Sequence, residues 1–474
     1  MIQNLLVMGI GGSGNKALRA FIHLCAMGLG PENIDVFMID IDQNNGDVEL
    51  TKDTIIQYQT IKKRLVGNTE YFKSNINLKS EIPWSPFDNY GLRGSLTLGN
   101  YLNLIPLSED IKRLIPLFFT SDELTVPLEG GCKAHPNIGA FLMATIFSDK
   151  KFEDMLIQHF TKQNSAIYLF NSIFGGTGAS GGPVIVNGIN KYFAQALNGI
   201  TYKRIPIGMS VLLPYFIIPK STDDEEKLKI QSQTFDANAA AALPYYKTSV
   251  PADVIYFAGD HVKASYKNYA SGKKAQLNPA HLLELYSGIF AIDFCNSNFD
   301  MEIRVNTRFN LITFGNEDND DYSIELLDIP NINGVNLKNR IVNLQILSNT
   351  YKYFYSLKDK IPLTRFSWFT EISDYKNIKS SDNFFDDLKT YFNLYDCWME
   401  QMTINNARLK YFNNLERIDN IIQGKPVQEV SDIDQINKYF NIPKLKNKRN
   451  EYSDFMEICN NGINYFMDKS KVLN

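Results

Sequence analysis

Residues 174–183 read Phe-Gly-Gly-Thr-Gly-Ala-Ser-Gly-Gly-Pro, and this glycine-rich stretch decides how the chain is interpreted. It follows an apolar run, residues 166–170, that predicts a buried strand, and it precedes an apolar segment, residues 184–194, that predicts a helix. A glycine loop between a strand and a helix presents backbone N–H groups and a helix N-terminus to an anion. The sequence therefore predicts a phosphate-binding loop, although a flexible turn between two core elements would have a similar composition.

A second glycine loop follows the first predicted strand, residues 5–8, and reads Gly9-Ile10-Gly11-Gly12-Ser13-Gly14-Asn15. A helix is predicted from residue 16 to residue 27, and a second strand, residues 35–39, ends in Asp40 and Asp42. Such a unit is typical of nucleotide binding, with phosphate at the helix N-terminus and acids near the ribose or base. The two acids would equally well cap a turn.

A third loop of small residues, 130–139, precedes a helix predicted over residues 140–147. It reads Gly-Gly-Cys-Lys-Ala-His-Pro-Asn-Ile-Gly. Because all three loops come after a strand and before a helix, we expect them to meet at the carboxyl edge of one parallel sheet. Ligands bind at this edge in open α/β folds.

The remaining elements are predicted from hydrophobic periodicity. Residues 50–128 are irregular and predict an insertion with some helix, such as residues 109–118. Strands are predicted at 205–213 and 254–258, a helix at 235–246, a central helix from 278 to 294 with Asn278 as its N-cap, and a strand pair at 308–314 and 322–327. Further helices are predicted at 340–357, 384–402, 411–422 and 452–467.

Composition narrows the class of protein. The 474 residues predict two or three domains, and a net charge of −4 offers no electrostatic footprint for nucleic acid or an anionic membrane. No apolar run reaches the roughly 20 residues of a membrane span, and the N-terminus does not resemble a signal peptide, so we expect a cytoplasmic protein. The five cysteines are far apart, without a C-x-x-C pair, which argues against a disulfide framework and a zinc site; no protein-held metal site is predicted.

In their order along the chain, these motifs resemble those of the tubulin/FtsZ superfamily of GTP-binding, filament-forming proteins. The stretch from Gly11 to Asn15 resembles the first nucleotide loop, and Asp40 and Asp42 stand where the second loop belongs. Residues 134–139 are similar to the third loop, which reads Ala-Asn-Pro-x-Ile-Gly in FtsZ, and residues 175–178 with Pro183 match the Gly-Gly-Thr-Gly signature. Pro214 falls where the proline of the fifth loop belongs, and residues 253–257 resemble the strand before the central helix.

The resemblance covers residues 1 to about 300, and the long insertion and the helical C-terminal part look most like the divergent bacterial tubulin-like proteins. It implies an α/β fold, with a Rossmann-like parallel-sheet domain over residues 1–277, including the insertion. The central helix and the start of a smaller α+β part would occupy residues 278–335, and a mainly helical region residues 336–474.

The resemblance also implies GTP or GDP as the ligand, with Mg²⁺ as a companion ion. Backbone amides of the first and last loops would surround the phosphates, and the hydroxyls of Ser13 and Thr177 would bond to them. The implied binding residues are Gly11, Gly12, Ser13, Gly14, Asn15, Asp40, Asp42, His135, Asn137, Gly175, Gly176, Thr177, Gly178, Ala179 and Asn278.

Three of these residues have a second interpretation. Asn15 would reach the nucleoside or cap a helix, and His135, which replaces the asparagine of the family, would contact the γ-phosphate or fill space. Asn278, with His281 beside it, is the nearest candidate for reading the base, but the two would also serve as an N-cap and a packed helix residue. Specificity for guanine over another purine is therefore left open.

In this family, the next subunit of the filament completes the catalytic pocket with an acid from the loop after its central helix. Asp300 and Glu302 are the candidate catalytic acids, but Ile303 stands where the second acid of the family pattern belongs. A competing register through Asp293 places Asn296 there instead. The sequence thus predicts slow or assembly-dependent GTP hydrolysis, because such catalysis depends on how the acid is positioned.

The leading hypothesis is a GTP-binding protein that associates with itself head to tail into filaments. An additional partner is expected to dock on the C-terminal helices. The alternatives are an NAD- or FAD-dependent oxidoreductase built on the first glycine loop, an ATP-using adenylating enzyme, and a nucleotide-binding scaffold without hydrolysis in a bacterial conflict system.

Overall fold

The computed structural model describes residues 1–87, 96–104, 107–128, 132, 135–194, 204–217, 232–261, 263–265, 274, 276–300, 306–314, 322–325, 329, 331, 336–360, 362–404, 407–410, 445 and 447–470. None of the helices in these ranges is long and apolar enough to cross a membrane.

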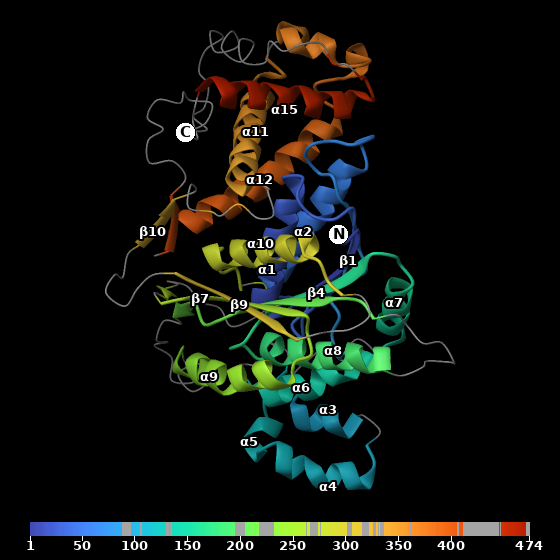
Figure 1. Ribbon diagram of the computed structural model, residues 1–474, viewed down its shortest axis with the longest axis vertical. Helices are drawn as coiled ribbons and strands as arrows, with labels where there is room; N and C mark the ends of the chain where they lie inside the picture. Colours follow the sequence, from blue (N-terminus) through green and yellow to red (C-terminus); the bar gives the residue numbers. More distant parts are fainter. Residues whose placement is uncertain are drawn as a thin grey trace.

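A seven-stranded sheet forms the centre of the molecule (Figure 1). Its strand order is β3-β2-β1-β4-β5-β7-β9, and all neighbouring strands are parallel. The strands are β1 (Asn4–Ile10), β2 (Asn33–Ile39), β3 (Asn75–Leu78), β4 (Ser165–Ser172), β5 (Ile207–Leu212), β7 (Val254–Asp260) and β9 (Arg308–Phe314). Every residue of β4 and β5 is buried, as expected for parallel strands covered on both faces. The predicted α/β fold with a Rossmann-like parallel sheet is confirmed.

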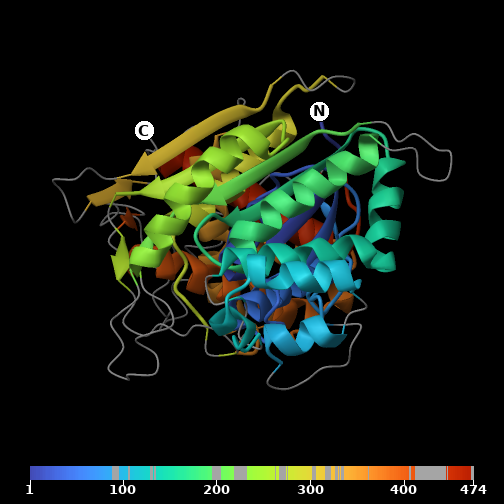
Figure 2. The ribbon, with the colours of Figure 1, turned by 90° about the horizontal axis from the view of Figure 1, so that it is seen from below.

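Helices cover both faces of this sheet (Figures 1 and 2). One face carries α1 (Gly11–Ala26), α2 (Gly46–Lys62) and α10 (Leu282–Asn296). The opposite face carries α6 (Pro136–Ala144), α8 (Thr177–Ala194) and α9 (Ser232–Ser249), with α7 (Lys150–Phe160) beside the sheet. The helices α3 (Leu98–Leu104), α4 (Glu109–Phe118) and α5 (Ser121–Leu124) lie beyond α6 and belong to the predicted insertion.

The C-terminal helices form a further layer over α1 and α2 (Figure 1). They are α11 (Leu337–Leu357), α12 (Asn383–Ile404) and α15 (Glu451–Ser470), so three of the four helices predicted there are confirmed, and residues 411–422 lie outside the described ranges. The contact with α1 is specific: the His23 ring stacks on Trp398 with centroids 4.6 Å apart, and its Nδ1 lies 3.0 Å from the Tyr391 hydroxyl. The helical region is thus packed firmly onto the sheet domain.

Two predictions about secondary structure were wrong. Residues 46–62 form α2 and residues 75–78 form the edge strand β3, although 50–128 looked irregular. The helical period of α2 was hidden because two buried threonines, Thr51 and Thr54, lie among its apolar residues and bond to backbone carbonyls instead. The strand pair does not form either: β9 joins β7 in the main sheet, whereas β10 (Tyr322–Glu325) pairs with β11 (Ala407–Lys410). A second short pair joins β6 (Phe216–Ile217) to β8 (Ala264–Ser265).

The helix predicted over residues 140–147 begins earlier, since α6 starts at Pro136, and three further helices differ in how they begin. The first two include much of the glycine loops, since α1 starts at Gly11 and α8 at Thr177. Glycine disfavours helix, but here tertiary packing overrides that preference because the helices approach the strands closely. The third, α10, starts at Leu282, and its N-cap is His281, which forms a capping box with Glu284; the cap predicted at Asn278 was wrong.

The packing of α1 on β4 makes Gly14 sensitive to substitution. A Cβ atom at this position would lie 2.3 Å from the carbonyl oxygen of Phe170, and neither backbone can move away without disturbing the sheet. We expect Gly14→Ala to lower the free energy of unfolding by about 2 kcal/mol or more, measured by urea denaturation. The control is Gly175→Ala, where the nearest atom to a Cβ is the Ser172 hydroxyl at 3.3 Å. Equal stability of the two variants would contradict this packing argument.

Candidate functional site

Two helix N-termini meet at the carboxyl edge of the sheet. The strands β1 and β4 are neighbours, and they lead into α1 and α8. Gly11 has a φ of +70°, a value that side chains rarely allow, and a Cβ there would lie 3.1 Å from the backbone nitrogen of Gly178. The first turns of the two helices therefore touch, and their unpaired N–H groups belong to one small region.

The predicted phosphate-binding residues occupy these turns and the segment before α8. They are Gly11, Gly12, Ser13 and Gly14 at the start of α1, Gly175 and Gly176 before α8, and Thr177, Gly178 and Ala179 at its start. Ser13 is partly exposed, and its hydroxyl has no hydrogen-bond partner in the described part of the chain. Thr177 is buried and bonds to the Cys132 thiol, whose Cβ lies against Gly176. Backbone amides and the Ser13 hydroxyl are thus available to an anion.

Asn15 takes part in the structure of this edge. It is fully buried, and its Nδ2 donates to the carbonyl oxygens of Gly11, at 3.0 Å, and Ile39, at 3.4 Å. Its Oδ1 is buried, has no hydrogen-bond partner among the residues that the structure describes, and lies next to Gly9. Asn15 therefore ties the start of α1 to the end of β2 and does not face an open space.

The acids after β2 form a turn. The Asp40 carboxyl group accepts from the Asp42 backbone N–H at 3.1 Å and from the Asn45 amide at 3.3 Å, while Asp42 accepts from the Asn44 backbone N–H at 3.2 Å. Both acids are buried. Burial, reinforced by repulsion from Asp42, raises the pKa of Asp40 to about 8, so this side chain is protonated at neutral pH. The turn leads to Asn45, which caps α2 by accepting from the Asp47 N–H at 2.9 Å.

The third loop turns toward the inserted helices. His135 is the N-cap residue of α6, and its Nδ1 lies 3.7 Å from the Glu123 carboxylate of α5. The Asn137 amide donates to the same carboxylate at 2.7 Å and to the Phe118 carbonyl at 3.3 Å. Both side chains thus hold the insertion against α6. The structure does not bring them into contact with the glycine turns, although α6 itself packs on α8 through Gly139 and Gly176.

A segment before α10 lies across the starts of α1 and α2. The Gln276 side chain accepts from the Asn45 amide at 3.2 Å, and its nitrogen would lie 3.0 Å from a Cβ at Gly12. The backbone N–H of Asn278 donates to the Asp47 carboxylate at 3.4 Å. Asn278 is therefore held against the first turn of α2, two residues after the Gln276 side chain that lies beside Gly12.

Besides Oδ1 of Asn15, two acceptor oxygens in this region have no hydrogen-bond partner in the described part of the chain. They are Oδ1 of Asp47 and Oδ1 of Asn278, and both are buried. Burial raises the pKa of Asp47 to about 6, against the opposing charges of Lys16 and Arg19, so its carboxylate is ionised at neutral pH. An unpaired buried acceptor is costly, and a ligand with two N–H donors would satisfy both.

Beneath the segment lies a buried ion pair that the sequence analysis missed. Lys16 Nζ is 2.6 Å from the Glu284 carboxylate and donates to the Pro279 carbonyl at 2.8 Å. Glu284 also accepts from the Tyr215 hydroxyl at 2.9 Å and from the His281 backbone N–H at 3.2 Å. The available signal was the spacing of Lys16, Arg19 and His23, which places three basic residues on one face of an otherwise apolar helix.

His281 is part of the same structure. Burial, with the nearby charge of Lys16, lowers its pKa to about 3, and its Nδ1 accepts from the Leu283 N–H at 3.2 Å. The ring is therefore neutral with its proton on Nε2, which lies 3.9 Å from the Asp260 carboxylate. His281 positions the start of α10, and because its side chain is fully buried it cannot contact the base of a nucleotide.

The candidate catalytic acid lies at the opposite edge of the sheet. Residues that precede β1 and β5 contact the end of α10 and the segment after it: the Ile2 N–H donates to the Cys295 carbonyl at 3.2 Å, and Arg204 donates to the Asp300 carbonyl at 2.8 Å. Asp300 is exposed at this amino edge, remote from the glycine turns of its own chain. Glu302 lies outside the described residues. In the described ranges, no three His, Cys, Asp or Glu side chains cluster to hold a metal ion.

No protein-family model matches the chain, and neither does a curated protein. Among solved structures it is similar to CetZ from Methanosaeta thermophila strain DSM 6194, with 17% sequence identity and a TM-score of 0.24. The match covers 54% of this chain and 46% of that one, so less than half of the solved protein is spanned. This similarity is too remote to assign a family or a function.

The raised pKa of Asp40 predicts a pH effect on stability. An unfolded aspartate loses its proton near pH 4, but the folded chain keeps this proton up to about pH 8. Between these values the unfolded state binds fewer protons, so the free energy of unfolding falls as the pH rises, by at most about 1.4 kcal/mol per pH unit. The side chain in Asp40→Asn cannot titrate. The free energy of unfolding of this variant should therefore fall less steeply than that of wild type between about pH 5 and about pH 7.5, measured by urea denaturation.

The matched control is Asp122→Asn, at an exposed position of α5, which should keep the wild-type slope. If Asp40→Asn and wild type lost stability in parallel, the protonated state assigned to Asp40 would be incorrect.

Proposed function

We propose that the protein binds GTP at the contact between α1 and α8, as a divergent relative of the tubulin/FtsZ superfamily. One observation carries this proposal: the first turns of α1 and α8 touch where the strand order reverses. From β1 the chain builds the sheet outward through β2 and β3, and from β4 it builds the other side through β5 and β7. Such a switch point opens a crevice at the carboxyl edge, and two helix N-termini there favour a polyphosphate.

The two unpaired acceptors favour guanine as the base. Guanine presents two neighbouring donors, the N1–H and the 2-amino group, whereas the corresponding edge of adenine carries an acceptor at N1. The carboxylate of Asp47 and the amide oxygen of Asn278 would match the two donors. A base that lacks them would leave both oxygens buried and unpaired, and discrimination of this kind is strong. Gln276, which lies against Gly12, would turn aside to admit the ligand.

The position of Asp300 supports assembly-dependent hydrolysis. In a single chain this acid and the glycine turns lie at opposite edges of the sheet, so they cannot act on one nucleotide. A head-to-tail contact would place the amino edge of one subunit on the carboxyl edge of the next, and because such a contact does not close, it produces a filament. Asp300 would then orient the attacking water beside the γ-phosphate of the neighbouring subunit. Mg²⁺ would neutralise phosphate charge in such a site.

The first experiment identifies the nucleotide. Purified protein is denatured, and released nucleotide is separated by chromatography, before and after incubation with GTP, ATP or NAD. Guanine nucleotide supports the proposal, whereas adenine nucleotide or NAD would replace it with one of the Rossmann-type alternatives.

Ser13→Ala tests the site directly. Because the Ser13 hydroxyl has no partner in the described part of the chain, we expect unchanged stability and a five- to twentyfold (about 1–2 kcal/mol) weaker binding of GTP, measured by isothermal titration calorimetry. Ser121→Ala, at the exposed first turn of α5, serves as the control and should bind like wild type. Wild-type affinity in the Ser13 variant would place the phosphates elsewhere.

Subunit mixing tests catalysis across the contact. We expect Asp300→Ala to bind GTP normally but to lose most of its turnover at assembling concentrations, since only the side chain is removed and the Arg204 bond to its backbone remains. Mixing it with Ser13→Ala, which keeps the acid, should restore part of the turnover of the Asp300 variant. If the mixture hydrolyses no faster than the two variants do separately, Asp300 does not act on a neighbour.

A further inference from the structure

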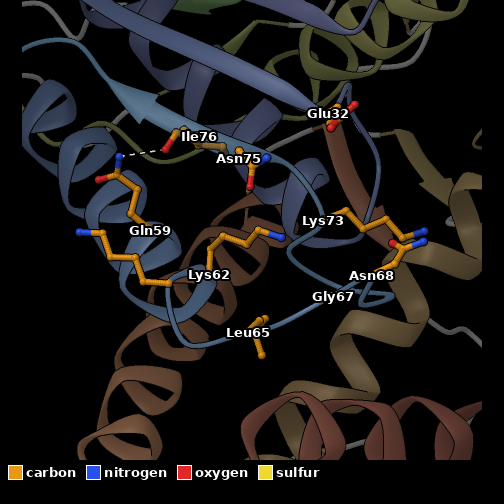
Figure 3. Close-up of a pocket in the computed structure, with 10 residues that line it drawn as sticks. Glu32, Gln59, Lys62, Leu65, Gly67, Asn68, Lys73, Asn75 and Ile76 are labelled. Atoms are coloured by element: carbon orange, nitrogen blue, oxygen red, sulfur yellow. Dashed lines mark hydrogen bonds between the residues drawn. The ribbon is translucent and has the colours of Figure 1, made fainter. Parts of the chain in front are cut away.

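A polar cavity lies away from the glycine turns, at the end of the sheet where β2 and β3 begin (Figure 3). It is an open cavity lined by the C-terminal end of α2, the following segment into the start of β3, and the residue before β2. Its volume is about 710 Å³, which is within the range of small-molecule sites. The lining residues are Glu32, Gln59, Lys62, Lys63, Leu65, Gly67, Asn68, Lys73, Asn75 and Ile76.

The charge of this cavity is positive and only partly compensated. Three lysines line it against one carboxylate, that of Glu32. Lys73 forms an ion pair of 3.4 Å with Glu70, but Lys62 and Lys63 have no ion-pair partner among the described residues. Lys62 is half-buried, and burial lowers its pKa. A half-buried ammonium without a counter-charge is costly unless an anion binds beside it.

Besides the charged side chains, the cavity is lined by uncharged amide groups and by apolar surface. The Gln59 amide is held in place because it donates to the Ile76 carbonyl at 3.0 Å (Figure 3). Asn68 and Asn75 contribute further amide groups at exposed positions, and the buried side chains of Leu65 and Ile76 provide apolar surface. Figure 3 shows Lys62 extending from α2 toward Asn75, and Lys73 extending toward Asn68.

The C-terminal region holds one wall of the cavity in place. Ser453 bonds to both backbone groups of Val66, at 2.7 Å and 3.1 Å, and Asn450 donates to the Arg64 carbonyl at 2.7 Å. Arg449 donates to the Asn68 carbonyl at 2.6 Å and packs against Gly67, whose φ of +74° completes the turn. The segment from residue 64 to residue 68 is thus held by the start of α15 and the two residues before it.

We infer that this cavity binds a small phosphate-bearing molecule, with the phosphate against Lys62 and Lys63 and a polar body against the amides of Gln59, Asn68 and Asn75. Lysine suits a compact anion such as phosphate because its ammonium is a point charge with three donors. The Glu32 carboxylate, at the rim of the cavity, accepts hydrogen bonds from hydroxyl groups on the part of the ligand that does not carry the phosphate. The inference does not depend on the GTP site, because none of the lining residues belongs to the glycine turns.

Titration calorimetry of the full chain with inorganic pyrophosphate tests this inference. Wild type is compared with Lys62→Gln/Lys63→Gln and with Lys52→Gln, a control on the same helix whose lysine pairs with Glu49 outside the cavity. We expect the double variant to bind pyrophosphate at least tenfold more weakly and the control to bind like wild type. Equal affinity in the double variant, or no binding by wild type, would overturn the inference.

Pyrophosphate is also titrated into Ser13→Ala, to separate the two proposed sites. Binding that is lost in Ser13→Ala but kept in the lysine variant would belong to the glycine turns; it would overturn the cavity site and leave the GTP proposal intact. If the double variant failed to fold, Lys63→Gln, at an exposed position, would decide in its place, with an expected loss of about threefold. Wild-type affinity in that single variant would overturn the inference as well.

Discussion

The close approach of α1 to strand β4 is the constraint on which the rest of the structure depends. It requires a glycine at position 14, since any side chain would collide with the Phe170 carbonyl. Once α1 lies this close to the sheet, its first turn reaches the first turn of α8, and Gly11 meets Gly178. The candidate nucleotide site is therefore a consequence of how tightly the first helix packs on the central strands.

The same helix carries charge into the core. The ion pair between Lys16 and Glu284 is almost completely buried, which is costly unless all its polar atoms are satisfied. Here the Pro279 carbonyl, the Tyr215 hydroxyl and the His281 N–H provide the remaining bonds. Removing one partner of such a pair typically costs about 3–5 kcal/mol. The pair thus fixes the start of α10 against α1 and determines where the segment with Asn278 must lie.

The C-terminal helices contribute to both proposed sites. Gln401 of α12 accepts from the Ala280 backbone N–H at 3.0 Å, next to Asn278, while residues at the start of α15 hold the wall of the lysine cavity. Neither contact could be predicted from the hydrophobic periodicity of these helices. The aromatic residues Tyr391, Tyr395 and Trp398 of α12 pack around His23 of α1.

The sequence by itself determined the α/β class, most strands of the sheet and the meeting of glycine turns at one edge, because strand, loop and helix follow one another locally and strands buried on both faces are continuously apolar. Only the tertiary structure decided where the helices begin and that β9 joins the main sheet. It also decided that Asn15 and Asn137 form hydrogen bonds within the protein and that His135 faces Glu123. It alone also decided the raised pKa of Asp40 and the pairing of Lys16 with Glu284. These features depend on contacts between residues far apart in the chain and on their burial, which no local pattern encodes.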